Sequence, residues 1–596
     1  MLNKDTESCF RREEEEGEYR LNSDERIGTS ATDIIQEFST ATVNRFPGLI
    51  PGIKKGPENH PKTKEAHRIL NFWLMMSRQD PLKVTLSAFT EIGKTESDIP
   101  VLKQRHYIGR GVIRSTFADT PYAEPILLDI LYPKYSAVFV ALDSGVVKCA
   151  DFGTAYAYLR PYLNKPSIVP SRLATRKDED RRMRRSVLVD GRITTRHVPP
   201  RRVWDLYANR VIPYWVAHKH PWGISHAWVD EKDRIDVMTP INGCEWPVPM
   251  PKDANLNLIR IEMLNLGAEY AWLDVLCLRQ EGGKGEDLRL EEWKLDVPTI
   301  GSVFEKAGKV VCYFNGLGRP LCLTTDYFES DRCWFRRAWT LQEIAEDYII
   351  AGDCGDDMME ESVRRRFDEQ LKSLHERRGV ALVSEMQHRV STKPLDKVAG
   401  LAYLLQTDSI PIYDPHQSPA DAWEVLMEVV ESDIRLALLF RYHEPGDGRK
   451  YWRPSWEQAM RTNIVVQRSF IFAGQVATTG DPDADCYTGY RIKTAYVHGL
   501  SEVKTEAPPR QGELVLIDAT AVLRTFKVVA DHPFSIPDGL YTLLSCHYWF
   551  SGSHLWVIGK LRDDGKFEKL SVLRSADDEQ ERLLDMGLEE IDTFLC

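Results

Sequence analysis

The stretch YAWLDVLCL, residues 270–278, is an apolar run that reaches an aspartate at its fifth position. A short apolar run of this kind predicts a buried strand that ends close to Asp274. Further strand-like and helix-like runs alternate around it: WGISHAWV at 222–229, LNLIRIEMLNLG at 256–267, VPTIGSVFEKA at 297–307 and KVVCYF at 309–314. This alternation predicts an α/β domain with a mostly parallel sheet at 201–352. In such sheets ligands bind at the carboxyl ends of the strands, where Asp274 is expected.

The composition of the chain restricts its class. At 596 residues it is too long for one hydrophobic core, and 43% hydrophobic with 28% charged residues is typical of globular proteins. A formal charge of −12 disfavours general binding of nucleic-acid backbones. The sequence contains no apolar run of about 18 residues, so no transmembrane segment is predicted. Eleven scattered cysteines without zinc-site spacing favour a reduced, cytoplasmic protein and no metal site.

Composition shifts divide the chain into five predicted regions. They are a disordered acidic tail at 1–30, an accessory α+β region at 31–200 that ends in a basic linker, the α/β domain at 201–352, a mainly helical region at 353–483 and a β-rich region at 484–596. The basic segment 171–202 favours a solvated linker over a nuclear-import or phosphate-binding patch, because acidic residues are interleaved with the basic ones. Within it, Asp190-Gly191 predicts the turn of a hairpin.

The stretch DRCWFRRAWTLQE, residues 331–343, places a glutamate four residues after a tryptophan. If this stretch is helical, Trp339 and Glu343 share one face, and Leu341 lies on the face that docks to the core. Two interpretations remain open. Trp339 and Glu343 line a cleft, or the tryptophan packs under another domain while Glu343 is solvated or paired with Arg336 or Arg337.

Two further candidates lie at predicted strand ends. Asp274 is either a ligand contact or a helix cap, and both interpretations fit its position. Ser225 and His226 end the first predicted strand, but adjacent residues in a strand point to opposite faces. This geometry disfavours a Ser–His nucleophile pair, and Trp228 is expected in the core.

Three sequence blocks resemble the fungal heterokaryon-incompatibility (HET) domain. They are ISHAW at 224–228, YAWLDVLCLRQE at 270–281 and RAWTLQE at 337–343, and the segment YWRPSWEQ at 451–458 is similar to one that often follows this domain. The resemblance covers only the α/β region. The chain departs from the family pattern at His226, usually tyrosine, at Val229, usually glycine, and at Arg279, usually aspartate.

The HET domain is distantly similar to Toll/interleukin-receptor (TIR) domains, so the resemblance implies a TIR-like, flavodoxin-like sheet. TIR domains that hydrolyse NAD carry a Trp-Cys-x-x-Glu motif, and Trp339 and Glu343 have the same separation. The resemblance therefore implies that Glu343 is catalytic and that NAD is a substrate, with no cofactor. Substrate contacts would come from Trp339, which could stack on a ring, from Asp274 and Ser225, and from the guanidinium groups of Arg279, Arg336 and Arg337, which suit a diphosphate.

The chemistry of NAD suits a single carboxylate. Nicotinamide leaves as a neutral molecule from a cationic N-glycosidic bond, so its departure needs no general acid, and a nearby anion stabilises the developing positive charge. For the whole protein, the resemblance implies nonself recognition and programmed cell death in fungi, with self-association and other incompatibility proteins as partners. The alternative is a non-enzymatic, self-associating signalling module.

Overall fold

The computed structural model describes most of the chain beyond residue 168. The described ranges are 169–343, 347–352, 359–375, 379–462, 474–502, 509–517, 521–545, 555–576 and 589–596, with isolated positions at 154–161 and 579–586. The predicted tail at 1–30 and most of the accessory region at 31–200 lie outside the described residues. Everything described belongs to one compact unit of the chain.

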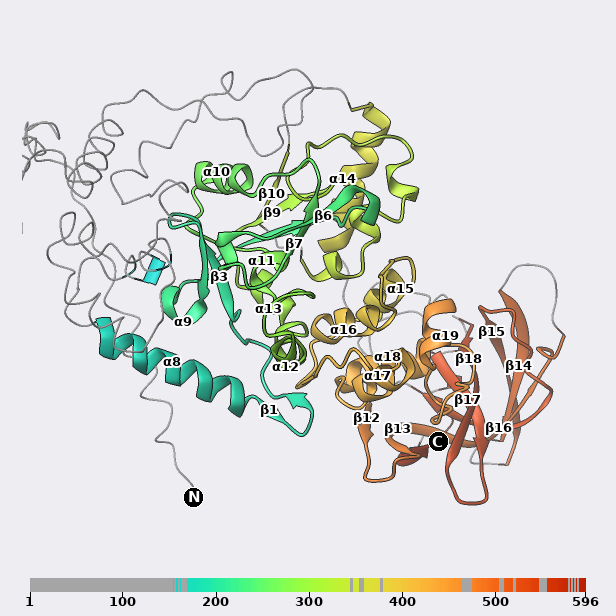
Figure 1. Cartoon of the computed structure of the whole chain (residues 1–596). Helices are drawn as coiled ribbons and strands as arrows, with labels where there is room; N and C mark the ends of the chain where they lie inside the picture. Colours follow the sequence, from blue (N-terminus) through green and yellow to red (C-terminus); the bar gives the residue numbers. More distant parts are fainter. Residues whose placement is uncertain are drawn as a thin grey trace, which may run out of the picture. The chain divides into compact units, whose positions relative to one another are not determined.

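A six-stranded sheet forms the centre of the α/β region (Figure 1). Its spatial order is β10-β9-β5-β8-β3-β4, with bounds β3 Arg202–Asp205, β4 Arg210–Pro213, β5 Trp222–His226, β8 Tyr270–Trp272, β9 Val310–Tyr313 and β10 Tyr348–Ile350. The four strands β10, β9, β5 and β8 are parallel neighbours, whereas β3 and β4 add an antiparallel edge. Taken in chain order, the parallel strands have the spatial order 2-1-3-4. The predicted sheet with mostly parallel strands among helices is confirmed.

Helix α9 Tyr214–Ala217 leads from β4 into β5, and further helices lie between the parallel strands. They are α10 Leu256–Leu266, α11 Asp274–Cys277, α12 Glu286–Asp296 and α13 Ile300–Glu305, and a small hairpin of β6 Arg234–Val237 and β7 Val248–Pro251 precedes α10. The Asn255 side chain caps α10, which ends at Gly267 with φ 102°. Gly223 in β5 allows close packing of α13, because a Cβ there would lie 2.7 Å from the Phe304 ring.

The basic segment is not the predicted linker. It holds helix α8 Val169–Ser186 and a hairpin of β1 Leu188–Val189 and β2 Arg192–Ile193, whose turn has positive φ at Asp190 and Gly191. The predicted hairpin is therefore confirmed. The buried Arg184 guanidinium pairs with Asp180 within the helix and with Asp296 of α12, so the second pair holds the helix against the fold and the guanidinium charge is compensated.

The predicted helical region is confirmed for its described residues. Its helices are α14 Glu361–His375, α15 Ala381–Gln387, α16 Leu395–Leu404, α17 Pro419–Met427, α18 Ser432–Arg441 and α19 Trp456–Arg461, with a short strand β11 Ile410–Pro411 that pairs with β2. Helix α19 begins with a capping box, in which Ser455 and Gln458 satisfy each other's backbone N–H groups. The PSWEQ sequence therefore has a local structural role.

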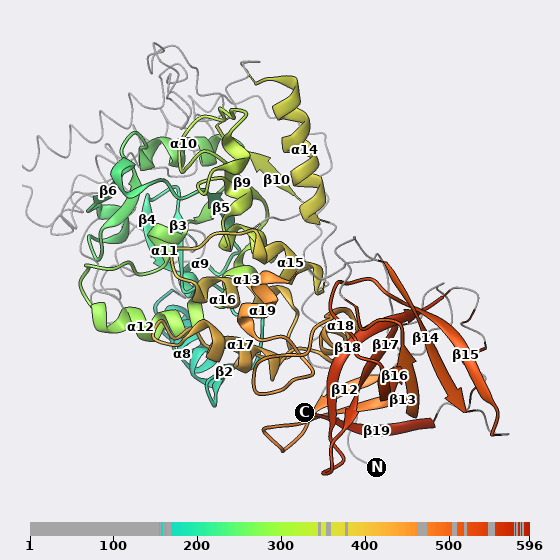
Figure 2. The same ribbon diagram turned by 90° about the vertical axis from the view of Figure 1, so that its right-hand side faces the viewer.

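The predicted β-rich C-terminal region is confirmed as an antiparallel sheet (Figure 2). Its strands are β12 Gln475–Thr478, β13 Asp485–His498, β14 Arg510–Ile517, β15 Leu523–Ala530, β16 Gly539–Ser545, β17 Leu555–Leu561, β18 Phe567–Ser575 and β19 Glu589–Leu595. The sheet closes on itself because β13 pairs with both β14 and β16. The only parallel contact among these described strands joins β18 to β19. The turn between β17 and β18 contains Gly565 at φ 79°.

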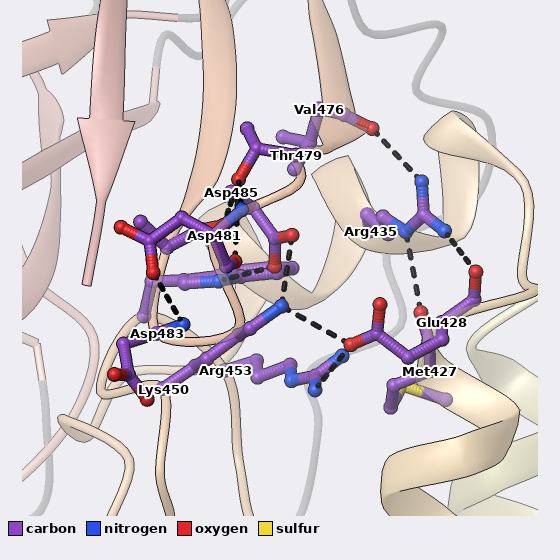
Figure 3. A network of polar contacts seen from close by, with 12 residues as sticks. Met427, Glu428, Arg435, Lys450, Arg453, Val476, Thr479, Asp481, Asp483 and Asp485 are labelled. Atoms are coloured by element: carbon purple, nitrogen blue, oxygen red, sulfur yellow. Dashed lines mark hydrogen bonds and ion pairs between the residues drawn. The ribbon is translucent and has the colours of Figure 1, made fainter.

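A buried polar network joins the helical region to this sheet (Figure 3). Asp485 at the start of β13 accepts hydrogen bonds from Lys450 Nζ at 2.9 Å and from Trp452 Nε1 at 3.0 Å. Lys450 also pairs with Glu428, and Arg453 pairs with Glu424 and Glu428. Each charge in the network is therefore matched inside the protein.

The described helices are all too short or too polar to span a bilayer.

Candidate functional site

A cavity of about 590 Å³ opens at the carboxyl ends of β5 and β8. This volume lies within the usual range for small-molecule sites. Because β5 is flanked by β8 on one side and β9 on the other, the chain reverses its direction of travel across the sheet at this point. Such a switch point leaves a crevice between the connections on either side, which is where open α/β sheets bind ligands.

The two strand ends deliver side chains to the cavity. In β5, Ser225 and His226 point to different partners: the Ser225 hydroxyl donates to Glu343, and His226 Nε2 lies 2.9 Å from Asp274 Oδ1. Strand β8 ends at Trp272, and Asp274 opens helix α11, where its carboxylate also accepts the Val275 backbone N–H at 2.7 Å. Asp274 is therefore a helix-start residue and a cavity residue at once.

Glu343 and Trp339 reach the cavity from a short 3₁₀ helix, η10 Trp339–Gln342. The predicted α-helix over this stretch is wrong. Arg337 is extended and forms a parallel bridge with Val390, which stops any helix from running through it. Leu341 is buried in the core as expected, and both Trp339 and Glu343 line the cavity. The shared surface was therefore predicted correctly, but on the wrong kind of helix.

The Glu343 carboxyl lies in an environment that disfavours its charge. Its Oε2 atom accepts from Ser225 Oγ at 2.6 Å, and Ser225 Oγ in turn accepts from Trp334 Nε1 at 2.8 Å. Burial raises the pKa of Glu343 to about 7, and the negative charge of Asp274 adds to this rise. The Ser225 hydroxyl opposes the shift without cancelling it. Near neutral pH the carboxyl therefore exists in both protonation states.

His226 and Asp274 form a second polar pair on the same cavity. Burial alone would lower the pKa of His226, but the charge and hydrogen bond of Asp274 outweigh burial and raise it. Burial would likewise raise the pKa of Asp274, yet His226, the Val275 N–H and the Trp228 indole lower it. At a pH below the raised pKa of Glu343, Glu343 is protonated while Asp274 remains ionised. The two carboxyls therefore differ in charge at the same pH.

Aromatic and cationic side chains complete the walls. Trp228 stacks on His226 with ring centroids 5.8 Å apart, and Arg234 lies over the ring of this tryptophan. Elsewhere in the lining, Asp396 accepts hydrogen bonds from Trp339 and from the Tyr413 hydroxyl. The cavity therefore offers flat apolar surfaces next to charged groups.

Buried hydrogen bonds hold the segment that brings Arg337 to the cavity. The buried Arg389 guanidinium donates to the Arg337 carbonyl oxygen at 2.7 Å and to Thr340 Oγ1 at 3.0 Å. These contacts attach η10 to the segment that follows α15. Residues of the helical region thus complete a site whose centre belongs to the α/β region.

The structure brings together most of the residues predicted from sequence. Glu343, Trp339, Asp274 and Arg337 line one cavity, and Ser225 contacts Glu343 from behind it.

Two predicted substrate contacts do not lie there. The Arg279 side chain pairs with Glu245 and Glu292 and lies over Trp246, whereas Arg336 pairs with Asp331 and lines a separate cavity. Both arginines have structural partners, and neither lines the cavity that contains Glu343.

Several cavity residues were missed by the sequence reasoning. They are His226, Trp228, Arg234, Lys393, Asp396 and Tyr413. His226 ends a strand adjacent to the one that precedes Asp274, so its place could have been inferred from the topology. The residues at 390–413 carry no sequence signal, because their position depends on how the helical region packs. Trp228, expected in the core, is partly exposed to the cavity.

Among the described residues, no three His, Cys, Asp or Glu side chains are arranged to hold a metal ion. The cavity presents carboxyl, imidazole, guanidinium, ammonium and aromatic groups. Comparisons with protein-family models, with curated proteins and with solved structures gave no match.

Proposed function

We propose that this chain is a fungal HET-domain protein whose α/β region has a TIR-like, flavodoxin-like sheet. The three sequence blocks motivate this assignment. The strand order supports it, since 2-1-3-4 for the parallel strands is the order with which flavodoxin-like sheets begin. The blocks also meet in space: ISHAW supplies β5, YAWLDVLCL supplies β8 and α11, and RAWTLQE supplies η10.

The proposed activity is hydrolysis of NAD at the nicotinamide–ribose bond. The C1′–N bond breaks, its electron pair leaves with neutral nicotinamide, and water adds to C1′ and releases a proton. The ionised Glu343 carboxylate stabilises the positive charge on the ribose in the transition state. A single well-placed anion is sufficient because the leaving group needs no proton.

One observation carries this proposal: Glu343 lines a cavity of suitable size at the switch point of the sheet, between aromatic walls. A solvated glutamate on a convex surface would have favoured a silent module instead. Trp339 offers a surface for a planar ring, and Arg337, Arg234 and Lys393 are the cavity cations available to a diphosphate.

In the cell, we propose that this activity serves nonself recognition and programmed cell death in the cytoplasm. A second candidate, a self-associating module without catalysis, is favoured by a separate observation. Large apolar side chains are exposed on the C-terminal sheet, namely Tyr496, Ile517, Leu523, Leu540 and Phe594. Exposed apolar side chains mark protein–protein contacts where they form a contiguous patch, and Ile517 and Leu523 are cross-strand neighbours in β14 and β15.

The test is nicotinamide release from NAD by the purified full-length protein. We expect wild type to release nicotinamide, and Glu343→Gln to release it about 100-fold more slowly, the usual cost of losing one transition-state electrostatic contact. Glu291→Gln on α12 is the matched control, since Glu291 is exposed and pairs only with Lys294 among the described residues. Absence of release by concentrated wild-type protein would contradict the enzymatic proposal and favour the silent module.

A further inference from the structure

The two cavity carboxyls have unequal hydrogen-bond partners. Asp274 accepts from three donors, namely His226, the Val275 backbone and the Trp228 indole. Glu343 accepts from the Ser225 hydroxyl through Oε2, and the Ser225 oxygen is itself fixed by the Trp334 N–H. Several donors stabilise a carboxylate, whereas one hydroxyl in a buried setting does so poorly. The geometry therefore distinguishes an ionised Asp274 from a Glu343 that retains a proton.

The position of that proton follows from the same contacts. Because Ser225 donates to Oε2, an acidic proton on Glu343 sits on Oε1. Paired carboxyls whose environments separate their protonation states are the usual arrangement for acid and base roles in glycoside hydrolysis. The nicotinamide reaction uses only the ionised form of Glu343, so the protonated form has no role in it.

We propose that this cavity also hydrolyses N-ribosides whose base is uncharged in the substrate and must be protonated to leave, such as purine ribosides, with Glu343 as the proton donor and Asp274 as the anionic partner. This inference rests on the site of the proposed function but requires the opposite protonation state. In the reaction, the Glu343 carboxyl proton passes to a ring nitrogen of the base while the C1′–N bond breaks. The bond's electron pair stays on the base. Water adds to C1′, and its proton passes to Asp274 and then to solvent, while Glu343 takes up a proton from solvent and is ready for the next turnover.

The cavity suits this substrate class in its walls and size. Trp228, Trp339 and Tyr413 line the cavity and offer aromatic rings against which a purine can stack. A volume of about 590 Å³ accommodates a nucleoside or a nucleotide. Arg337 and Lys393 can receive a 5′-phosphate, so monophosphates fit as well as free nucleosides.

Several charged or titratable groups face Glu343 and shape its titration. They are His226 from β5, Cys312 from β9, Asp274 from α11, Arg337 ahead of η10, Arg389 after α15, and Asp396 with Lys393 from the segment entering α16. Asp274 opposes ionisation of Glu343, whereas His226 and Arg389 favour it. Since burial raises the pKa of Glu343 to about 7, the two proposed reactions should respond to pH in opposite ways.

The experiment measures two reactions of the full-length protein between pH 5.5 and pH 8.5. The substrates are NAD, followed by nicotinamide release, and inosine or AMP, followed by release of the free base. Purine release should fall about tenfold per pH unit above pH 7, because the proton donor is lost, while NAD hydrolysis should rise up to pH 7 and then level. Glu343→Gln should reduce both reactions at least about 100-fold. Glu291→Gln should change neither.

A second variant identifies the acid. Asp274 raises the pKa of His226, so loss of the imidazolium proton is a second candidate cause of an alkaline decline. In His226→Gln, the decline of purine release above pH 7 should persist if Glu343 is the proton donor. Disappearance of the decline with release retained would overturn the assignment.

The outcomes separate this inference from the proposed function. NAD hydrolysis without purine release at pH 5.5 would overturn the inference and leave the proposed function standing. Purine release without NAD hydrolysis would support the inference and overturn the proposed function. Absence of both reactions would overturn both.

Discussion

Glu343 and Asp485 are two carboxyl groups removed from bulk water, and their surroundings differ in one respect. Both oxygens of Asp485 accept hydrogen bonds, one from the Lys450 ammonium and one from the Trp452 indole, and the residue is fully buried. Glu343 has a serine hydroxyl as a partner and faces a cavity. A buried charge with hydrogen-bonded counter-charges is costly to disrupt. A carboxyl in a cleft whose pKa is raised because its charge lacks such partners is a candidate functional group. The comparison therefore separates a structural carboxylate from a functional one.

The largest effect should follow from breaking the compensated pair. In Asp485→Asn, Lys450 loses its buried counter-ion and retains only the partly exposed Glu428. Removal of one partner from a buried pair leaves an uncompensated charge, so the free energy of unfolding should fall by roughly 3 kcal/mol. Urea unfolding of the full-length protein measures this loss.

The matched control lies two residues away. Asp483 is exposed and pairs with Arg449, so Asp483→Asn should change the free energy of unfolding by less than about 1 kcal/mol. Equal effects of the two substitutions would show that burial of the Asp485 network contributes nothing, and the comparison with Glu343 would lose its basis.

The second effect has the opposite sign. Glutamine at position 343 avoids the cost of ionising a carboxyl in the cavity, so Glu343→Gln should raise the free energy of unfolding at pH 8. The pKa of Glu343 is raised from 4.5 to about 7, which means that the folded state binds the proton more tightly than the unfolded chain. Wild type therefore loses stability as the pH rises from 4.5 through 7, while the variant does not.

The expected gain is up to about 3 kcal/mol above pH 7 and close to zero below pH 4.5. Urea unfolding at pH 4, 6 and 8 measures it, with Glu291→Gln again as the control. A variant that is less stable than wild type at pH 8 would show that the Glu343 carboxylate is well compensated, as Asp485 is.

The sequence indicated the cavity carboxyls but not the buried carboxylate of Asp485. The apolar runs at 222–229, 270–278 and 309–314 became β5, β8 and β9, because buried parallel strands have a distinctive composition. Asp274 and Glu343 were found because they lie in recognisable blocks. Asp485 was not singled out, since its partners Lys450 and Trp452 are distant in sequence.

The errors have a common physical origin. The helix predicted through Glu343 was wrong because Arg337 pairs with Val390, a long-range contact that local periodicity does not encode. The basic segment formed α8, because Asp296 and backbone carbonyl groups compensate Arg184. Arg279 and Arg336 were predicted as substrate contacts, but each forms ion pairs with nearby carboxylates outside the cavity. In each case tertiary partners decided the outcome.

The smallest effect concerns the single hydroxyl that holds Glu343. Ser225→Ala removes the donor to Oε2 and leaves the Trp334 indole without this acceptor. The pKa of Glu343 should rise further, because its charged form loses a hydrogen bond, and the acidic limb of NAD hydrolysis should move upward by about one pH unit. The free energy of unfolding should fall by about 1 kcal/mol. Ser330→Ala, which removes a hydroxyl contact in an exposed turn, is the control and should move neither quantity. If Ser225→Ala leaves the pH profile unchanged, the hydroxyl does not tune Glu343, and the cavity carboxyl must be set by burial and Asp274 alone.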